Sequence, residues 1–356
     1  MKKVTFVIES LGYGGAERVL TELAKYLSEN GYEITIITFK KAKQEYQLNN
    51  RIKRVDLEIA ESGINKLIIG RRKLKKELKR AEVSICISFD ILANILLLLS
   101  APKNCKVIIS ERNAPKQTEL SIYSKVLRFL LYRKTDLIVF QTEEAAKCYS
   151  KKIQGKSVII ANPIKENLPV KQYDNVNKEI VAVGRLAKQK NYELMLFAFK
   201  DFLKKHKEYI LSIYGDGDER EKLQNLCKEL SISENVIFHG KTSDVHSRIC
   251  NAEVYLLTSH YEGIPNALLE AMAMGFPVVA TNCPSGGVKL LLSRKSVGIL
   301  VDKFCVEDIS CALCSLVENP INASRMGKAA QYVRDEYSIQ NIGHKWIMLI
   351  EGNRKK

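Results

Sequence analysis

Residues 254–272, which read VYLLTSHYEGIPNALLEAM, carry the most specific structural pattern in the sequence. Val254–Leu257 is a short apolar run of the kind found in buried strands. Pro265 suits the first turn of a helix, and the apolar residues after it predict that this helix is buried. The stretch therefore predicts a strand, a loop and a helix, which is the repeating unit of a parallel α/β sheet.

The same alternation continues in both directions along the chain. One group of apolar strands is expected at Val4–Ile8, Ile34–Phe39, Val83–Phe89, Val107–Ser110, Leu137–Phe140 and Val158–Ile160. A second group is expected at Ile180–Val183, Ile210–Tyr214, Val236–Phe238, Val254–Leu257, Val278–Ala280 and Ile299–Val301. Apolar strands separated by helices indicate parallel sheets that are covered on both faces.

A polar segment from Lys165 to Lys178, after Asn162-Pro163-Ile164, separates the two groups and is expected to be a linker. We therefore expect an α/β protein with two Rossmann-like, doubly wound domains that face a central cleft. The expected parts are residues 1–163, residues 164–336, and a C-terminal helix at 337–356 that packs back on the first domain. Such folds bind ligands at the carboxyl ends of their strands.

Positive charge is concentrated in the first half of the chain. Residues 1–160 contain 30 Lys and Arg against 17 Asp and Glu, a net charge of +13, whereas residues 161–356 contain 26 against 23, a net charge of +3. This asymmetry indicates an anionic partner for the first domain. Nucleic acid would explain the charge too, but no nucleic-acid-binding module is recognised and the basic tract lacks aromatic residues.

Lys66 to Arg80 is the densest basic stretch, with eight basic residues and one acid. Leu67, Leu74 and Leu78 have core spacing, so an ordinary surface helix remains an alternative to a helix at a membrane interface. The charge asymmetry favours membrane contact. The residues expected to meet the membrane or an acceptor are Lys66, Arg71, Arg72, Lys75, Lys76 and Lys79.

The loop and helix after Val254–Leu257 carry the candidate chemistry. The first helical amides, at Asn266, Ala267 and Leu268, would be donors for a phosphate at the positive end of the helix. Glu270 lies about one turn further on, where a buried carboxylate needs hydrogen-bond donors such as ribose hydroxyls. Glu262 precedes the helix and can face a sugar. The alternative is that both glutamates merely cap helices or pair with lysines.

This segment, with the pattern E-G-x-P-x-x-x-x-E, closely resembles the signature of glycosyltransferase family 4, which has the GT-B fold. Three further segments resemble motifs of that family in the same order. They are the glycine-rich loop Gly14-Gly15-Ala16-Glu17-Arg18, the basic segment Gly184-Arg185-Leu186 with Lys190, and the glycine turn Tyr214-Gly215-Asp216-Gly217-Asp218. The resemblance extends from residue 4 to about residue 300.

The resemblance implies roles for individual residues. Glu270 would hold the donor ribose, Glu262 the transferred sugar, and Arg185 and Lys190 the diphosphate as it leaves. A solvated basic loop is the alternative for Arg185 and Lys190. The full set expected to bind the donor is Gly15, Arg185, Lys190, Gly263, Ile264, Pro265, Asn266, Ala267, Leu268 and Glu270.

The chain departs from many members of the family after Val107–Ile109. It reads Ser110-Glu111-Arg112-Asn113 where many relatives have a histidine. Arg112 cannot act as a base at ordinary pH, so it is expected to contact phosphate or sugar hydroxyls, with Glu111 orienting it. A surface ion pair is the alternative. The acceptor base is unassigned, and the leaving phosphate itself is often given that role in retaining enzymes.

Several metal and cofactor interpretations are disfavoured. Asp216 and Asp218 are expected to form a turn and a helix N-cap rather than a metal site. Cys311 and Cys314 lack a second pair at zinc spacing. A nicotinamide site would need an acidic residue at the end of the second expected strand, where Lys40 stands instead. We expect no metal and no cofactor.

The resemblance predicts a retaining glycosyltransferase that moves a hexose or N-acetylhexosamine from a nucleotide-diphosphate sugar, UDP-linked, to a polyprenyl-diphosphate-linked glycan acceptor. The alternatives are an inactive donor-binding scaffold and a nucleotide-sugar epimerase of the same fold. The N-terminal residues predict a strand and no signal peptide, and the apolar run from Ile91 to Ala101 is too short to span a bilayer. We therefore expect a cytoplasmic protein, peripherally bound to the inner face of the plasma membrane.

Overall fold

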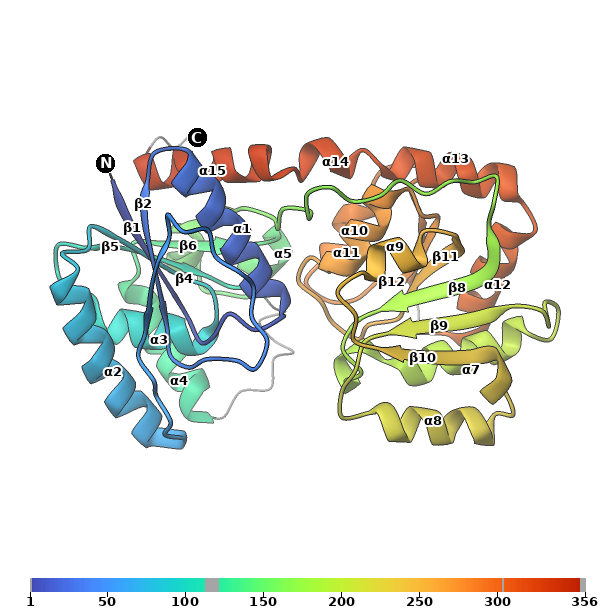
Figure 1. The fold of residues 1–356 in the computed structure, drawn as a ribbon, viewed down its shortest axis with the longest axis horizontal. Helices are drawn as coiled ribbons and strands as arrows, with labels where there is room; N and C mark the ends of the chain where they lie inside the picture. The colour runs from blue at the N-terminus through green and yellow to red at the C-terminus, as the bar shows by residue number, and fades with distance from the viewer. Residues whose placement is uncertain (1, 113–121, 303, 353–356) are drawn as a thin grey trace. The chain divides into compact units, whose positions relative to one another are not determined.

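A computed structural model describes residues 2–112, 122–302 and 304–352. The chain divides into two compact units: residues 1–163 with 339–356, and residues 164–338. Each unit contains one parallel sheet with helices on both faces (Figure 1). None of the helices in the described residues combines the length and apolarity that a bilayer crossing requires.

The first unit contains a sheet of seven strands in the order β3-β2-β1-β4-β5-β6-β7, and all its pairs are parallel. The strands are β1 Lys3–Ile8, β2 Glu33–Thr38, β3 Lys53–Asp56, β4 Ile85–Ser88, β5 Lys106–Ser110, β6 Leu137–Phe140 and β7 Ser157–Ile159. The helices are α1 Gly15–Glu29, α2 Gly63–Arg80, α3 Ile91–Ser100, α4 Ile122–Leu131, the 3-10 turn η1 Tyr132–Lys134, α5 Glu143–Lys147, α6 Lys151–Gln154 and α15 Ile339–Glu351.

Alternate residues of these strands face two cores. Phe6 and Ile36 face the core beneath α1 and α15, which lie side by side (Figure 1). Trp346 of α15 is fully buried in that core. Val7 and Ile37, one residue further along, face the core beneath α2 and α3. The period of two along each strand therefore divides the apolar side chains between the two helical layers.

The second unit contains a sheet of six parallel strands in the order β10-β9-β8-β11-β12-β13. The strands are β8 Asn177–Val183, β9 Ile210–Tyr214, β10 Val236–Gly240, β11 Ala252–Leu257, β12 Val278–Thr281 and β13 Ile299–Val301. The helices are η2 Lys188–Lys190, α7 Tyr192–Phe202, α8 Arg220–Glu229, η3 Ser233–Asn235, α9 Val245–Ile249, α10 Asn266–Met274, α11 Gly287–Leu291, α12 Val306–Val317, α13 Pro320–Ala330 and α14 Val333–Glu336.

Strand order reverses between β8 and β11 in this sheet, because β9 and β10 lie on one side of β8 while β11, β12 and β13 lie on the other. A reversal of this kind opens the loops of the two central strands in opposite directions and leaves a place for a ligand at their carboxyl ends. The loops after β8 and β11 contain Arg185, Lys190 and Glu262.

Part of the segment expected to be a linker packs on the second unit. Lys171 is buried, its backbone amide bonds to the Met274 carbonyl at 2.8 Å, and its ammonium donates to the Ala252 carbonyl. Tyr173 donates its hydroxyl proton to the Gly275 carbonyl. These contacts fix the segment on the second unit, and its polar composition concealed that packing.

Candidate functional site

An ion pair at the carboxyl ends of β8 and β11 forms the centre of the candidate site. The Lys190 Nζ lies 2.5 Å from Glu262 Oε1, and the Ser259 hydroxyl donates to the same oxygen at 2.7 Å. The Glu262 side chain is 8% exposed and that of Lys190 is 18% exposed. A carboxylate at this depth requires a charged partner and hydrogen bonds, and both are present.

The loops that carry this pair are bonded to each other. The Thr258 hydroxyl donates to the Asn191 carbonyl at 2.9 Å, and the Gln189 side-chain amide donates to the Tyr261 carbonyl at 2.9 Å. The His260 backbone amide donates to the Gln189 carbonyl at 2.8 Å. The positions of Lys190 and Glu262 are therefore set by backbone contacts as well as by their own charges.

Glu270 lies on α10, and a histidine that sequence reasoning missed holds it. His246 of α9 places its Nε2 2.8 Å from Glu270 Oε2, and both side chains are largely buried. α10 begins after Pro265, and the amides of Ala267 and Leu268 in its first turn have no acceptor within the helix. Nothing in the pattern around His246 distinguishes it from a surface histidine.

Two close contacts between glycines and backbone shape the same edge of the sheet. A Cβ on Gly215 would lie 1.9 Å from the Gly184 carbonyl oxygen, and a Cβ on Gly287 would lie 1.7 Å from the Gly263 carbonyl oxygen. No side chain fits at either position. Gly287 was missed in the sequence, although the pair Gly286-Gly287 after an expected strand was an available signal.

Arg185 follows Gly184 and is exposed, and no ion pair or hydrogen bond joins its side chain to the part of the chain that the structure describes. The backbone of this loop is held, since Gly184 N donates to Tyr214 O at 2.9 Å and Leu186 N to Asp216 O at 3.1 Å. Arg185 therefore presents an unengaged cation from a fixed loop near Lys190.

Asp216 has a local structural role. Its carboxylate accepts from the Gly217 amide at 2.9 Å and lies 3.6 Å from the Arg220 guanidinium. The expected turn is therefore present. The expected N-cap is wrong, because α8 begins at Arg220 with Glu219 as its N-cap residue, and that residue makes no side-chain capping bond.

The segment after β5 in the first unit differs from its expected arrangement. Glu111 is buried and accepts hydrogen bonds from the hydroxyls of Tyr132 and Tyr149, the latter at 3.1 Å. Burial raises the pKa of Glu111. Neither orientation of Arg112 by Glu111 nor a surface ion pair between them is observed. The buried tyrosines hold this carboxylate instead.

Arg112 is held by aromatic rings and an amide. Its Nη1 donates to Asn162 Oδ1 at 2.8 Å, and its guanidinium lies 4.6 Å from the centre of the Phe89 ring and 5.6 Å from that of Trp346. Burial lowers its pKa to about 9, so it stays protonated at neutral pH. Asn113 lies outside the described residues.

The glycine-rich loop after β1 leads directly into α1. Gly14 is the N-cap residue and Gly15 the first helical residue. A Cβ on Gly14 would lie 2.2 Å from a Glu17 carboxylate oxygen, so the glycine allows this carboxylate to fold back over the loop. Burial raises the pKa of Glu17. Gly15 is thus at the carboxyl end of β1, the position expected for it.

The basic helix α2 has an inner and an outer face. Leu74 and Leu78 are fully buried against the sheet, as their spacing predicted. Lys66 turns inward and pairs with Glu9 at 2.7 Å, which disfavours its expected membrane contact. The cations on the outer face are exposed: Arg71, Arg72, Lys75, Lys76, Lys79 and Arg80.

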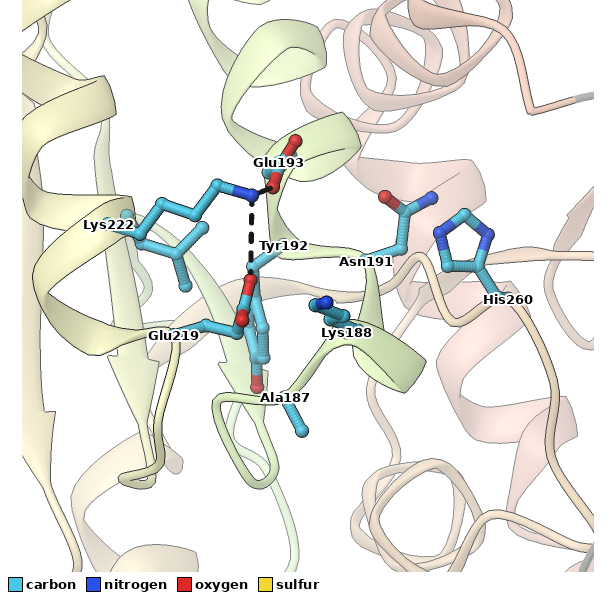
Figure 2. A pocket seen from close by; sticks show the side chains of 9 residues that line it. Ala187, Lys188, Asn191, Tyr192, Glu193, Glu219, Lys222 and His260 are labelled. Atoms are coloured by element: carbon cyan, nitrogen blue, oxygen red, sulfur yellow. Dashed lines mark hydrogen bonds and ion pairs between the residues drawn. The ribbon is translucent and has the colours of Figure 1, made fainter. Parts of the chain in front are cut away.

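A cavity of about 220 Å³ in the second unit lies beside the Lys190 loop (Figure 2). Lys188 and His260 belong to its wall, and Lys222 reaches across it to Glu193 and Glu219. None of the expected donor-binding residues lines this cavity. It is therefore next to the candidate site and separate from it.

Both cysteines expected to lack a metal role lie on α12, where Cys311 is exposed and Cys314 is buried. Cys314 lies near His206 and Glu318, with ligand atoms within 4.8 Å of one another. Within the described residues this group offers three ligands, fewer than the four of a structural zinc site.

Comparisons with known proteins identify the family of the chain. The family described as "Glycosyl transferases group 1" matches residues 164–333, and "Glycosyltransferase Family 4" matches residues 13–168. An uncharacterized glycosyltransferase of Haemophilus influenzae is 31% identical over 97% of this chain and 99% of its own length. The chain is a glycosyltransferase, and it belongs to glycosyltransferase family 4.

A second relative has a named activity. It is the Campylobacter jejuni "GalNAc-alpha-(1->4)-GalNAc-alpha-(1->3)-diNAcBac-PP-undecaprenol alpha-1,4-N-acetyl-D-galactosaminyltransferase", 29% identical over 98% of each chain. Relatives of this kind act in glycan biosynthesis. This chain is likewise a glycosyltransferase involved in glycan biosynthesis.

Solved structures share the fold. Sucrose-phosphate synthase from Thermosynechococcus elongatus has a TM-score of 0.86 and 16% identity, with 99% of each chain covered. Anabaena Alr3699/HepE, determined in complex with UDP, has a TM-score of 0.81 and 16% identity, with 99% of this chain and 100% of that chain covered. The predicted GT-B fold, with two Rossmann-like domains, is confirmed.

Proposed function

We propose that this protein is a retaining glycosyltransferase that moves a hexose or N-acetylhexosamine from a UDP-linked donor to a polyprenyl-diphosphate-linked glycan. The Lys190–Glu262 pair beside the first turn of α10 is the observation that carries the proposal. It places a cation, a carboxylate and helix amides at one edge of a sheet. These are the groups needed to bind a diphosphate and an attached sugar.

Each group has a separate task in the proposed reaction. Lys190 and Arg185 neutralise the charge that develops on the leaving diphosphate, together with the amides of α10. Glu262 accepts hydrogen bonds from hydroxyls of the transferred sugar. Glu270, held by His246, accepts hydrogen bonds from the ribose. The cations and amides already supply the positive charge, so catalysis in this proposal requires no metal and no cofactor.

The acceptor is assigned to the first unit. Arg112 is a cation held beside Phe89 at the end of β5, and it would contact a phosphate or sugar hydroxyl of the acceptor. The Campylobacter relative acts on an undecaprenyl-diphosphate-linked glycan, which supports a lipid-linked acceptor for this chain. The exposed cations of α2 would hold the enzyme at the inner face of the plasma membrane by attraction to anionic lipid.

A transfer assay tests the proposal. UDP-glucose, UDP-galactose, UDP-N-acetylglucosamine and UDP-N-acetylgalactosamine are first screened for thermal stabilisation of the protein, and donors that stabilise it are then incubated with short polyprenyl-diphosphate glycans. We expect one product in which the new glycosidic bond keeps the anomeric configuration of the donor. A product with inverted configuration would contradict the retaining assignment. Stabilisation by nucleotide without transfer to any lipid-linked glycan would contradict the acceptor assignment.

A further inference from the structure

Helix α4 exposes a group of large apolar side chains. Val126 is 51% exposed, Phe129 is 60% exposed and Leu130 is 53% exposed. They are spaced three and four residues apart, so they lie on one face of the helix. An exposed apolar group of this kind on a basic domain is typical of an interaction surface.

The opposite face of α4 is fixed to the first unit. Leu131 is buried, and Arg128 lies 4.0 Å from the buried carboxylate of Glu111. α4 also packs against α3. The helix is therefore held in place while Phe129 and Leu130 point away from the core.

Cations surround these apolar side chains. Lys125, Arg133 and Lys134 are exposed, and the Arg133 guanidinium lies 4.6 Å from the centre of the Phe129 ring. Residues 122–134 contain no acidic residue. α4 and the turn after it therefore form a helix with an apolar face and basic borders, the composition of segments that lie in a membrane interface.

The basic helix α2 adds a second apolar element. It packs against α3 from another side, and its first turns expose Ile64 and Ile68, at 65% and 61%. The exposed cations of α2 follow further along the same helix. α2 and α4 both pack against α3 in the first unit (Figure 1), so both exposed surfaces belong to that unit.

We infer that Val126, Phe129 and Leu130 of α4, together with Ile64 and Ile68 of α2, form an apolar anchor that enters the interface of an anionic lipid bilayer. The cations on both helices bind the headgroups around it. This inference deepens the membrane contact of the proposed function, because it adds insertion to an attraction that was assigned to charge alone. Binding then has one part that salt screens and one part that salt leaves intact.

The positive charge of the first unit favours an anionic bilayer, rather than a second copy of the chain, as the partner of this apolar surface. Residues 1–160 have a net charge of +13, and exposed cations lie on the same two helices as the exposed apolar side chains. Two identical faces of this kind would bring like charges together, which opposes self-association. An anionic leaflet offers both the apolar interior and the opposite charge.

Vesicle co-sedimentation at two salt concentrations tests the anchor without donor or acceptor, so its outcome is independent of the transfer assay. The vesicles are phosphatidylglycerol with phosphatidylethanolamine, compared with pure phosphatidylcholine. We expect a salt-resistant fraction for the wild type, reduced about tenfold or more in the double variant Phe129→Ser, Leu130→Ser, because two large apolar groups no longer leave water. Ile321→Ser, which removes an exposed apolar side chain of the second unit, is the matched control and should bind like the wild type.

A fluorescent reporter tests insertion directly. Trp346 is the single tryptophan and is fully buried, so Phe129→Trp adds one exposed indole. We expect its emission to shift to the blue with anionic vesicles and to be quenched by brominated acyl chains. Equal high-salt binding of the wild type and the double serine variant would overturn the inference. A concentration-dependent dimer that disappears in the double variant, or a blue shift with nucleic acid and none with vesicles, would also overturn it.

Discussion

The Lys190 ammonium and the Glu262 carboxylate lie 2.5 Å apart on loops that follow neighbouring strands of the second sheet. The two groups form an ion pair, and both side chains are largely buried. In the proposed reaction the diphosphate draws Lys190 towards its own charge, and the sugar hydroxyls take its place beside Glu262. The pair therefore holds both side chains in position before the donor arrives.

Removal of Arg185 is expected to separate catalysis from folding. Its side chain is exposed and has no partner among the residues that the structure describes, so Arg185→Ala should change the free energy of unfolding by no more than about 0.5 kcal/mol. Turnover should fall about tenfold or more, because the charge that Arg185 meets grows in the transition state. Lys188→Ala, which removes an exposed cation of the same loop, is the control. Near-normal turnover of the Arg185 variant would remove this residue from the diphosphate site.

Lys190→Ala is expected to act on both stability and turnover. It leaves the Glu262 carboxylate buried without its ion pair, which should cost about 1–3 kcal/mol of unfolding free energy. The double variant with Glu262→Gln should recover part of that stability while turnover stays low. Urea unfolding and transfer assays on the wild type, Lys190→Ala and the double variant measure the two effects. Recovery of turnover together with stability would show that the pair is only structural.

Glu270→Gln is expected to weaken nucleotide binding while the fold is kept. The carboxylate would bond to ribose hydroxyls, and loss of a charge-assisted bond costs about 1.5–3 kcal/mol, or roughly tenfold or more in affinity. Calorimetric titration with UDP measures the change. His246→Gln is a useful comparison, since it removes the residue that holds Glu270. We expect it to lower the affinity for UDP less than Glu270→Gln does. An unchanged affinity in the folded Glu270 variant would exclude this carboxylate from the site.

The strands with apolar side chains were predictable because burial on both faces leaves a continuous apolar run. β3, Lys53–Asp56, was not predicted, since it is a short polar strand at the edge of the sheet and none of its residues is fully buried. Its pairing with β2 is held by backbone bonds, which leave no pattern in side-chain hydrophobicity.

Positions within the site were predictable where a motif fixes local geometry, as for Glu262 and the start of α10. Contacts between distant segments were not. His246 meets Glu270 across 24 residues, and Tyr132 and Tyr149 meet Glu111 across 21 and 38 residues. Such partners are determined by the tertiary packing, so the expectation that Glu111 orients its neighbour Arg112 was wrong.

Activity is expected to survive metal removal. Lys190, Arg185 and the amides of α10 provide fixed positive charge where a divalent ion would otherwise bind the diphosphate, and Asp216 is engaged by Gly217 and Arg220. Transfer measured after dialysis against EDTA should equal that of the untreated enzyme. Loss of transfer that magnesium or manganese restores would contradict this, and Asp216→Asn and Asp218→Asn variants would then identify the ligands.

Gly287→Ala is expected to displace the loop before α10, although Gly287 is not part of that loop. The added Cβ would lie 1.7 Å from the Gly263 carbonyl oxygen, so the loop before α10 must move. Overpacking of this kind costs about 1–3 kcal/mol, and UDP affinity should fall with it. Gly155→Ala is the control, because its Cβ would meet only ordinary contacts at 3.6 Å or more. Equal stability and UDP affinity of the two variants would show that the close contact is easily relieved.

Lys171 is expected to make stability rise with pH. Burial lowers its pKa to about 8, against 10.5 for an ordinary lysine, although Glu253 opposes the shift. Between these values the unfolded chain binds more protons than the folded one, so raising the pH favours folding by up to ~3 kcal/mol from this group. Other groups titrate in the same range. The informative quantity is therefore the free energy of unfolding of the wild type minus that of Lys171→Met, measured by urea unfolding from pH 7 to pH 10.5. This difference should have its lowest value near pH 7 and should become more favourable to the wild type as the pH rises above 8. A difference that does not change with pH would contradict the lowered pKa of Lys171.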